Sequence, residues 1–372
     1  MNVTQITPQF APEVGGVGDY AAQLGRQMWS GHGIESRFLI GDPAWSPSGG
    51  AAEFTAEAVA KRSAIGLAEK IENATRVVVH YVGYGYQSRG VPFWLTGGLE
   101  RWKRSDKRHR LIAVFHELWS VGAPWRSEFY LGPVQRHLAA RLHRLCDAAM
   151  TSTPAMARML DAISPGKTTF QPIANSLPAV GLGEREWHAG GPVRVAVFGL
   201  EATRQRSVET HAALLRALHD AGLLKGVEVV GSRANAGDAP STDVQTLFSL
   251  VPAELVRVTA DVSPGEGAQR LAGADLFLSF YPSKWVCKSS AFTSALACGC
   301  VAVLPEAKFA APLVEGRDLL ACDGSAAAVA RFVERIRTEP LAPIAQAGWR
   351  WRAQHAAWPA TAQRIATMLC VS

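Results

Sequence analysis

Short apolar strands alternate with amphipathic helical patterns along nearly the whole chain, and this alternation constrains the fold more than any other feature. It begins with NVTQI near the start of the chain and continues to CVAVLPE, which ends at Glu306. Strands that alternate with helices are typical of βαβ units, in which a helical crossover joins two parallel strands. The sequence therefore predicts an α/β protein built on parallel sheets.

The alternation falls into two halves, separated by a Gly- and Pro-rich stretch at residues 175–192 that has no periodicity and reads as a linker. In the first half, strands are predicted at residues 2–6, 36–40, 76–81, 111–115, 148–152 and 168–173, with helices at 18–30 and 132–145. In the second half, strands are predicted at residues 193–200, 226–231, 254–260, 274–280 and 300–306, with helices at 208–222 and 289–299.

The two halves predict two Rossmann-like domains in tandem. We expect the first domain at residues 1–178, a linker at 179–192 and the second domain at 193–355. The last residues, 356–372, belong to a tail that is predicted to be helical from Pro343 onward, apart from Pro359.

The length and composition suit a soluble protein of this kind. A chain of 372 residues exceeds one typical domain. No apolar run approaches the roughly 20 residues that span a bilayer. The opening MNVTQITPQF lacks the basic region and apolar core of a signal peptide. We therefore expect a cytoplasmic protein.

The six cysteines are scattered, and no CxxC pair or Cys/His cluster has the spacing of zinc ligands. We expect buried or incidental thiols and no metal site.

The net charge of +6 is concentrated in RWKRSDKRHR, which begins at Arg101, ends at Arg110 and holds six Lys or Arg and one acid. Such a run fits anionic lipid headgroups or nucleic acid, whereas most charge runs are only solvated surfaces. We expect no nucleic-acid partner and a peripheral contact with an anionic membrane.

A glycine-rich stretch, GGVGDYAAQL, begins at Gly15 where the first helix should start. Backbone N–H groups at a helix N-terminus attract phosphate, and Gly15 and Gly16 would let a diphosphate approach closely. With Gly18 and Ala21 the stretch also fits the dinucleotide pattern G-x-G-x-x-A, and Asp42 could bind a ribose, so a dehydrogenase is an alternative. In a dinucleotide fold, however, the glycines follow the first strand directly, and here eight residues intervene.

Five segments together resemble the family-4 glycosyltransferases of the GT-B fold, in the same order along nearly the whole chain. They are PQFAPEVGGVGDYAAQLGRQM, AVFHELW, MTSTPAMARML, FQPIANSL and ALACGCVAVLPE. The resemblance implies two Rossmann-like domains that face each other across a cleft, with the acceptor on the first and the nucleotide on the second. It also implies that residues 356–372 cross back onto the first domain.

The resemblance implies a nucleotide-diphosphate sugar as donor and a saccharide or lipid-linked saccharide as acceptor. No metal or other cofactor is expected, because helix dipoles and cationic side chains offset the charge of the leaving diphosphate. The family implies retention of anomeric configuration, with the donor phosphate taking the acceptor proton. An inverting reaction would instead need a protein base.

The chain departs from the family where two glutamates usually stand. Aligning SALACG with the family's EAMACG places the second glutamate at Ser294 and the first at Val286. A serine at 294 can still hydrogen-bond the ribose or base of the donor, although without charge assistance. A valine can bind neither sugar nor phosphate.

The cations that face the diphosphate in the family are also changed. Gly199 is kept, Leu200 takes the place of an arginine, and Arg206 takes the place of a lysine. Arg204 lies close enough in sequence to substitute for the lost arginine.

New cationic and hydroxyl groups stand in CKSS, just before the helix at 289–299. Ser289 and Ser290 are residues that favour the N-cap, and Lys288 adds a point charge beside the positive helix end. Together they are predicted to hold a diphosphate without a carboxylate, as lysine, hydroxyl and helix do in a P-loop. The alternative is that the serines only cap the helix while Lys288 is solvated.

Three further candidates belong to the first domain. His116 and Glu117 follow a predicted strand at its carboxyl edge, where ligands sit in open α/β sheets. The resemblance implies that His116 faces the donor sugar, while Glu117 could orient it or act as a base. Asp19 could also be a base, or could simply favour the first turn of a helix.

The sequence thus predicts a bacterial, metal-independent glycosyltransferase that acts in surface polysaccharide or glycoconjugate synthesis. A GT-B sugar-nucleotide epimerase and a catalytically inactive scaffold with the same fold remain alternatives.

Overall fold

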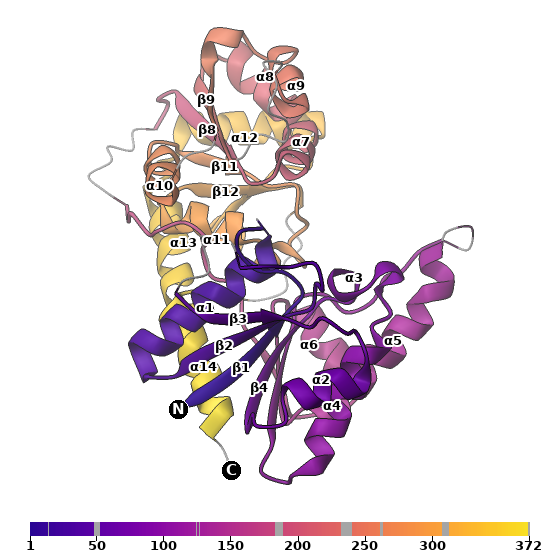
Figure 1. Ribbon diagram of the computed structural model, residues 1–372. Coiled ribbons are helices and arrows are strands. Elements are labelled where there is room, and N and C mark those ends of the chain that lie inside the picture. The colour runs from indigo at the N-terminus through magenta and orange to yellow at the C-terminus, as the bar shows by residue number, and fades with distance from the viewer. Residues whose placement is uncertain are drawn as a thin grey trace. The chain divides into compact units, whose positions relative to one another are not determined.

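The computed structural model describes residues 1–13, 15–47, 53–123, 125, 127–182, 189–231, 240–260, 263–306 and 312–370. The chain forms two compact units (Figure 1). The first comprises Met1–Pro172 and Trp358–Ser372, and the second comprises Ile173–Ala357. Each unit is built on one parallel sheet, which confirms the predicted α/β class.

The first unit holds a seven-stranded sheet in the order β3-β2-β1-β4-β5-β6-β7. Its strands are β1 (Asn2–Thr7), β2 (Glu35–Ile40), β3 (Thr55–Ala58), β4 (Arg76–Tyr81), β5 (Arg110–Phe115), β6 (Ala148–Thr151) and β7 (Thr168–Phe170). The central strands are almost wholly buried, because their apolar runs are covered on both faces by helices. The strand order reverses between β1 and β4, which makes their carboxyl ends the position where ligands bind in such sheets.

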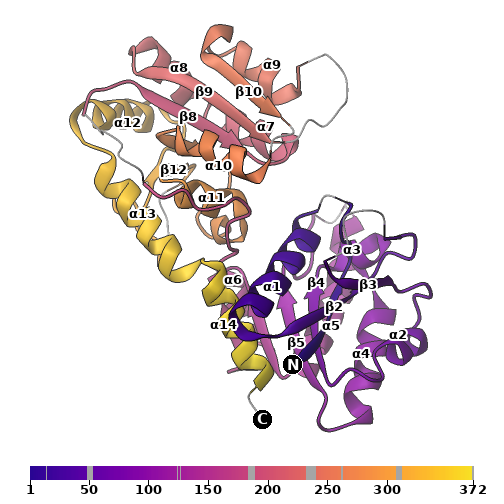
Figure 2. The same ribbon diagram turned by 60° about the vertical axis from the view of Figure 1, so that its left-hand side comes forward.

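Helices cover both faces of this sheet (Figures 1 and 2). They are α1 (Gly16–His32), α2 (Ala64–Lys70), α3 (Gly83–Tyr86), α4 (Phe93–Ser105), α5 (Ser127–Leu145), α6 (Pro154–Asp161) and α14 (Trp358–Cys370). The last helix, α14, packs beside α1. The carbonyls of Met368 and Leu369 near its end accept hydrogen bonds from Arg110 (2.9 Å) and Arg76 (3.2 Å), at the first residues of β5 and β4. The end of the chain therefore returns to the first unit.

The second unit holds a six-stranded parallel sheet in the order β10-β9-β8-β11-β12-β13. Its strands are β8 (Val193–Phe198), β9 (Leu224–Gly231), β10 (Val256–Ala260), β11 (Leu276–Leu278), β12 (Val301–Leu304) and β13 (Leu320–Ala321). Its helices are α7 (Glu201–Thr210), α8 (Ala212–Asp220), α9 (Thr242–Phe248), α10 (Pro264–Ala272), α11 (Ser290–Ala297), α12 (Ala326–Thr338) and α13 (Ala342–His355). Here the strand order reverses between β8 and β11, and the carboxyl ends of these two strands mark the ligand-binding position.

The segment 173–178 belongs to the second unit, whereas the sequence placed it at the end of the first domain. The N–H of Ile173 donates to the carbonyl of Cys287 (2.9 Å), and the N–H groups of Ser176 and Leu177 donate to the hydroxyl of Ser294. These hydrogen bonds tie the segment to the second unit. Residues 183–188 of the predicted linker lie outside the described residues.

Two short strands and one helix break were not predicted. The strands β3 and β13 have only four and two residues, and each lies at the edge of its sheet. The helix predicted at 208–222 is divided at His211, whose backbone is not helical. The buried ring of His211 is 3.0 Å from the carbonyl of Ser279, and this contact holds the chain at the break.

Five of the six cysteines are buried and Cys370 is exposed. Burial raises the pKa of the Cys146 and Cys287 thiols to about 12, so these groups hardly form thiolate at neutral pH. We expect one fast-reacting thiol in the native protein and six after denaturation, measured by reaction with a thiol-specific chromophore. The Cys370→Ser variant should have none. More than one fast thiol would contradict the described burial.

Candidate active site

The glycines that begin α1 differ in what surrounds them. A Cβ added at Gly18 would lie 2.6 Å from the carbonyl oxygen of Gln9, so only glycine lets the helix pack on the loop after β1. A Cβ added at Gly16 would meet no atom of the described residues within 4 Å. Gly15 is the N-cap residue and has no side chain with which to cap the helix. Gly16 is therefore the position at which the first turn of α1 is open to a ligand.

The three candidates of the first unit lie on neighbouring elements. His116 and Glu117 directly follow β5, and Asp19 is in the first turn of α1. Tyr20, next to Asp19, packs the edge of its ring against His116, with ring centroids 5.0 Å apart. His116 is half-buried, and Asp19 and Glu117 are exposed. The structure thus brings the start of α1 and the end of β5 together.

Although Asp19 is exposed, surrounding protein atoms partly desolvate its carboxyl group, which raises its pKa above the usual value; the hydrogen bond with the Gly15 backbone and the charge of Arg26 oppose this only in part. A carboxylate with a raised pKa is a stronger base than an ordinary aspartate.

Sequence reasoning missed two buried polar residues behind His116. Nδ1 of His80, near the end of β4, is 3.2 Å from Nε2 of His116, and Nε2 of His80 is 2.8 Å from the side-chain oxygen of Gln5 in β1. Both residues are fully buried. The signal was present in the sequence as single polar residues inside the apolar strands NVTQIT and RVVVHY.

In the second unit, Arg206 lies at the reversal point of the sheet. Its guanidinium stands over the ring of Phe280, 5.5 Å from the ring centroid, and Phe280 follows β11. Next to it, the hydroxyl of Ser207 accepts a hydrogen bond from the Phe280 N–H (3.2 Å). These contacts hold α7 against the loop after β11 and leave Arg206 exposed. Gly199, between β8 and α7, has a φ of 125°, a backbone conformation that favours glycine.

Arg204 does not take the place of the lost arginine. Only 3% of its side chain is exposed, and it pairs with fully buried Asp243 at 2.7 Å. It also donates to the carbonyl of Gly199 at 2.6 Å. The Arg204 guanidinium is committed to the interior of the second unit, so we do not retain it as a diphosphate ligand.

The predicted cap of the helix at 289–299 is present in α11. Ser289 is the N-cap of α11, and its hydroxyl accepts a hydrogen bond from the N–H of Phe292 (3.2 Å). Ser290 is the first helical residue, and Lys288 ends the short 3₁₀ turn Val286–Lys288 before it. Lys288 and Ser290 are half-buried. A lysine and a helix N-terminus thus stand side by side on the segment that leaves β11.

Ser294 is fully buried, and its hydroxyl accepts hydrogen bonds from the N–H groups of Ser176 (3.0 Å) and Leu177 (3.2 Å). These hydrogen bonds tie the segment 173–178 to α11, so we do not retain Ser294 as a ribose or base ligand. Val286, at the position of the other family glutamate, is also fully buried.

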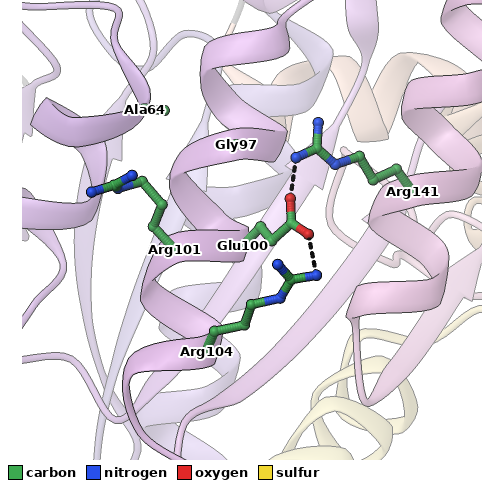
Figure 3. Close-up of a pocket in the computed structure, with 6 residues that line it drawn as sticks. All are labelled: Ala64, Gly97, Glu100, Arg101, Arg104 and Arg141. Carbon is green, nitrogen blue, oxygen red and sulfur yellow. Dashed lines mark hydrogen bonds and ion pairs between the residues drawn. The ribbon is translucent and has the colours of Figure 1, made fainter.

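A separate pocket of about 360 Å³ lies among α2, α4 and α5 (Figure 3). Glu100 stands at its centre and forms ion pairs with Arg104 and Arg141, while Arg101 extends away from them. The pocket belongs to the basic segment that precedes the amino end of β5, whereas His116 follows the carboxyl end of that strand. It is therefore not part of the candidate active site.

The basic segment itself is partly neutralised. Lys103 pairs with Asp147 at 2.9 Å, and Arg108 pairs with Asp106 at 2.7 Å. The Arg104 and Arg108 side chains are still 74% and 85% exposed. Within the described parts of the chain, no helix is both long and apolar enough to cross a membrane. Nor do three or more His, Cys, Asp or Glu side chains gather there as metal ligands would.

No protein-family model and no curated protein sequence matches the chain. Solved structures do match it over almost their full length. A glycosyltransferase from Rickettsia africae has a TM-score of 0.65 and 10% identity, over 99% of this chain and 97% of that one. The pneumococcal O-GlcNAc transferase GtfA, solved with UDP and GlcNAc, has a TM-score of 0.64 and 8% identity, over 99% and 98%.

A protein assigned as a UDP-N-acetylglucosamine 2-epimerase from Listeria monocytogenes also matches, with a TM-score of 0.58 and 12% identity over 98% of this chain and 94% of that one. Structural likeness at such low sequence identity establishes the architecture and not the reaction. Both the sheet topologies and these likenesses lead to the same conclusion: the chain has the GT-B fold.

Proposed function

We propose that the chain is a glycosyltransferase that moves a sugar from a nucleotide-diphosphate sugar to a saccharide or lipid-linked saccharide. The observation that carries this proposal is the placement of two cations. Arg206 lies on the helix after β8, and Lys288 lies on the segment after β11. These two strands flank the reversal point of the second sheet, where a nucleotide is expected to bind.

The proposed roles follow from charge and position. Arg206, Lys288 and the N–H groups at the start of α11 would stabilise the leaving diphosphate without a metal. Ser290 would add a hydroxyl, while Ser289 keeps the helix capped. In the first unit, the open turn at Gly16 would admit the donor phosphates.

The proposed reaction retains the anomeric configuration. The bond from the anomeric carbon to the donor phosphate oxygen breaks, a bond to the acceptor oxygen forms on the same face, and the acceptor proton passes to the departing phosphate. His116 would hydrogen-bond a hydroxyl of the donor sugar. Asp19 or Glu117 would serve as the base if the reaction inverts the configuration.

Two alternatives use the same fold. An epimerase is supported by the likeness to the Listeria protein, but it needs acids near the sugar, and Val286 removes one of them. A scaffold without activity is supported by the loss of both glutamates.

Proton NMR of nucleotide-sugar mixtures incubated with the protein distinguishes a transferase, an epimerase and an inactive scaffold. A transferase slowly hydrolyses its donor even without acceptor, which yields free sugar and nucleoside diphosphate. An epimerase yields a second nucleotide sugar with new anomeric signals. If no donor shows either change, the result contradicts an enzymatic function.

We also propose that the segment from Arg101 to Arg110 makes a peripheral contact with an anionic membrane on its cytoplasmic side. Its support is the exposure of Arg104 and Arg108, and each such cation contributes about 1 kcal/mol near an anionic surface. We expect the protein to float with vesicles that contain phosphatidylglycerol and to be released by salt. The Arg104→Glu/Arg108→Glu variant should remain unbound, and equal flotation of both proteins would contradict the contact.

A further inference from the structure

A diagonal row of polar side chains crosses four neighbouring strands of the first sheet. Ser36 of β2 pairs with Val3 of β1, so Gln5 lies two residues further along on the same face. Gln5 pairs with Val78 of β4, which places His80 two residues further along. His80 pairs with Val114 of β5, two residues before His116. Since side chains two residues apart in a strand share a face, the row rises across one face of the sheet to the carboxyl edge.

Each member of the row is hydrogen-bonded to the next. The Gln5 amide donates to the Ser36 hydroxyl (2.9 Å), His80 Nε2 contacts the Gln5 carbonyl oxygen (2.8 Å), and His80 Nδ1 contacts His116 Nε2 (3.2 Å). Ser36, Gln5 and His80 are 5%, 0% and 0% exposed. Buried polar groups that are this fully connected hold one arrangement, because breaking any hydrogen bond leaves a buried group without a partner.

The direction of these hydrogen bonds follows from Gln5. The Gln5 amide is placed with its nitrogen toward Ser36 and its oxygen toward His80, and in this placement the oxygen can only accept, so the proton of His80 is on Nε2. Burial, reinforced by His116, holds the pKa of His80 well below its usual value, and the ring is neutral. A neutral ring with its proton on Nε2 has a lone pair on Nδ1. The hydrogen bond between the two rings therefore requires a proton on His116 Nε2.

Aromatic packing fixes the planes of both rings. Tyr20 of α1 contacts His80 and His116 edge-on, with ring centroids 5.8 Å and 5.0 Å away. Trp358, at the start of α14, also packs against Tyr20, with ring centroids 5.1 Å apart. The return of the chain end to the first unit therefore supports this row.

We propose that Gln5 and His80 are positioning residues that hold His116 in its Nε2–H tautomer, so that Nδ1 of His116 is the hydrogen-bond acceptor. The purpose of this positioning rests on the proposed function: the His116 ring would be oriented before the donor sugar binds. A second proton on His116 would go to Nδ1 and would leave the row intact.

The test is ring-nitrogen NMR of the complete chain labelled with ¹⁵N-histidine, without substrate. Signals of His80 and His116 are assigned in the unmodified protein, labelled with ¹³C and ¹⁵N, by correlating each ring with its own backbone. We expect both rings to carry their proton on Nε2 at neutral pH, and His116 to become a mixture of tautomers in His80→Leu and Gln5→Leu. Gln5→Glu should keep both Nε2–H tautomers, because a carboxylate can only accept. His219→Gln, at a half-buried site in the second unit, is the matched control and should leave both rings unchanged.

A proton on Nδ1 of His116 in the unmodified protein would overturn the proposal. The tautomer of His116 in the unmodified protein tests the proposal even if the leucine variants fail to fold. An unchanged His116 in folded His80→Leu and Gln5→Leu variants would overturn it as well. Because no nucleotide takes part, a failure here would leave the proposed transferase function untouched, and a failure to bind nucleotides would leave the tautomers as they are.

Discussion

Replacing Lys288 with alanine is expected to weaken nucleoside-diphosphate binding by about ten- to a hundredfold. Hydrogen bonds to charged groups contribute roughly 1.5–3 kcal/mol, and each 1.4 kcal/mol is about a tenfold change in Kd. Lys288 ends the 3₁₀ turn directly before the N-cap of α11, so its ammonium group and the helix N-terminus would bind the same phosphate. Isothermal titration with the nucleotide that binds the unmodified protein measures the effect.

Lys284 provides the matched control for this variant. It lies on the same loop, four residues earlier, and is exposed. Lys284→Ala removes the same charge from the same segment, so it should change the Kd by less than about threefold, as an exposed and distant cation would. Equal affinities of Lys288→Ala and the unmodified protein would contradict the role of Lys288, whatever the other variants do.

Breaking the buried ion pair of the second unit is expected to give the largest loss of stability. Arg204→Met or Asp243→Leu alone leaves one buried charge without its partner, which costs about 3–5 kcal/mol in the free energy of unfolding. The double variant Arg204→Met/Asp243→Leu should recover most of this loss, because it buries apolar groups in place of both charges. Urea unfolding followed by far-ultraviolet circular dichroism measures these changes.

An exposed pair in the first unit is the control for this cycle. Arg26 and Glu53 pair at 2.8 Å with about half of each side chain exposed, so Glu53→Gln should cost less than about 1 kcal/mol. The double variant also distinguishes a structural role of Arg204 from a role in nucleotide binding. If Arg204 only stabilises the second unit, the folded double variant binds nucleotide as the unmodified protein does. Single variants as stable as the unmodified protein would contradict the structural role.

The architecture could be predicted from the sequence because local patterns determine it. Apolar runs such as RVVVHY and RLIAVF form central strands, and Ser289 has the side chain that an N-cap position favours. The edge strands β3 and β13 were missed because they have only four and two residues. Their place in the sheet depends on neighbours that are distant in sequence.

The candidate site could be predicted only in part, because burial decides what a polar side chain does. Arg204 and Arg206 are two residues apart on one helix, yet one pairs with Asp243 inside the unit and the other is exposed. Ser294 was predicted to bind the ribose or base, but its hydroxyl holds the segment 173–178. His80 and Gln5 could not be connected to His116 before the strand order was known, since they come from three separate parts of the chain.

The central claim is that the second unit binds a nucleoside diphosphate, and isothermal titration of the unmodified protein tests it most directly. UDP, GDP, ADP, TDP and CMP would be titrated with and without magnesium, with NAD as the control for a dinucleotide site. We expect one diphosphate to bind with the same Kd in both conditions, and NAD not to bind. If none of these nucleotides binds, the result contradicts the proposed transferase and favours an inactive scaffold with the GT-B fold.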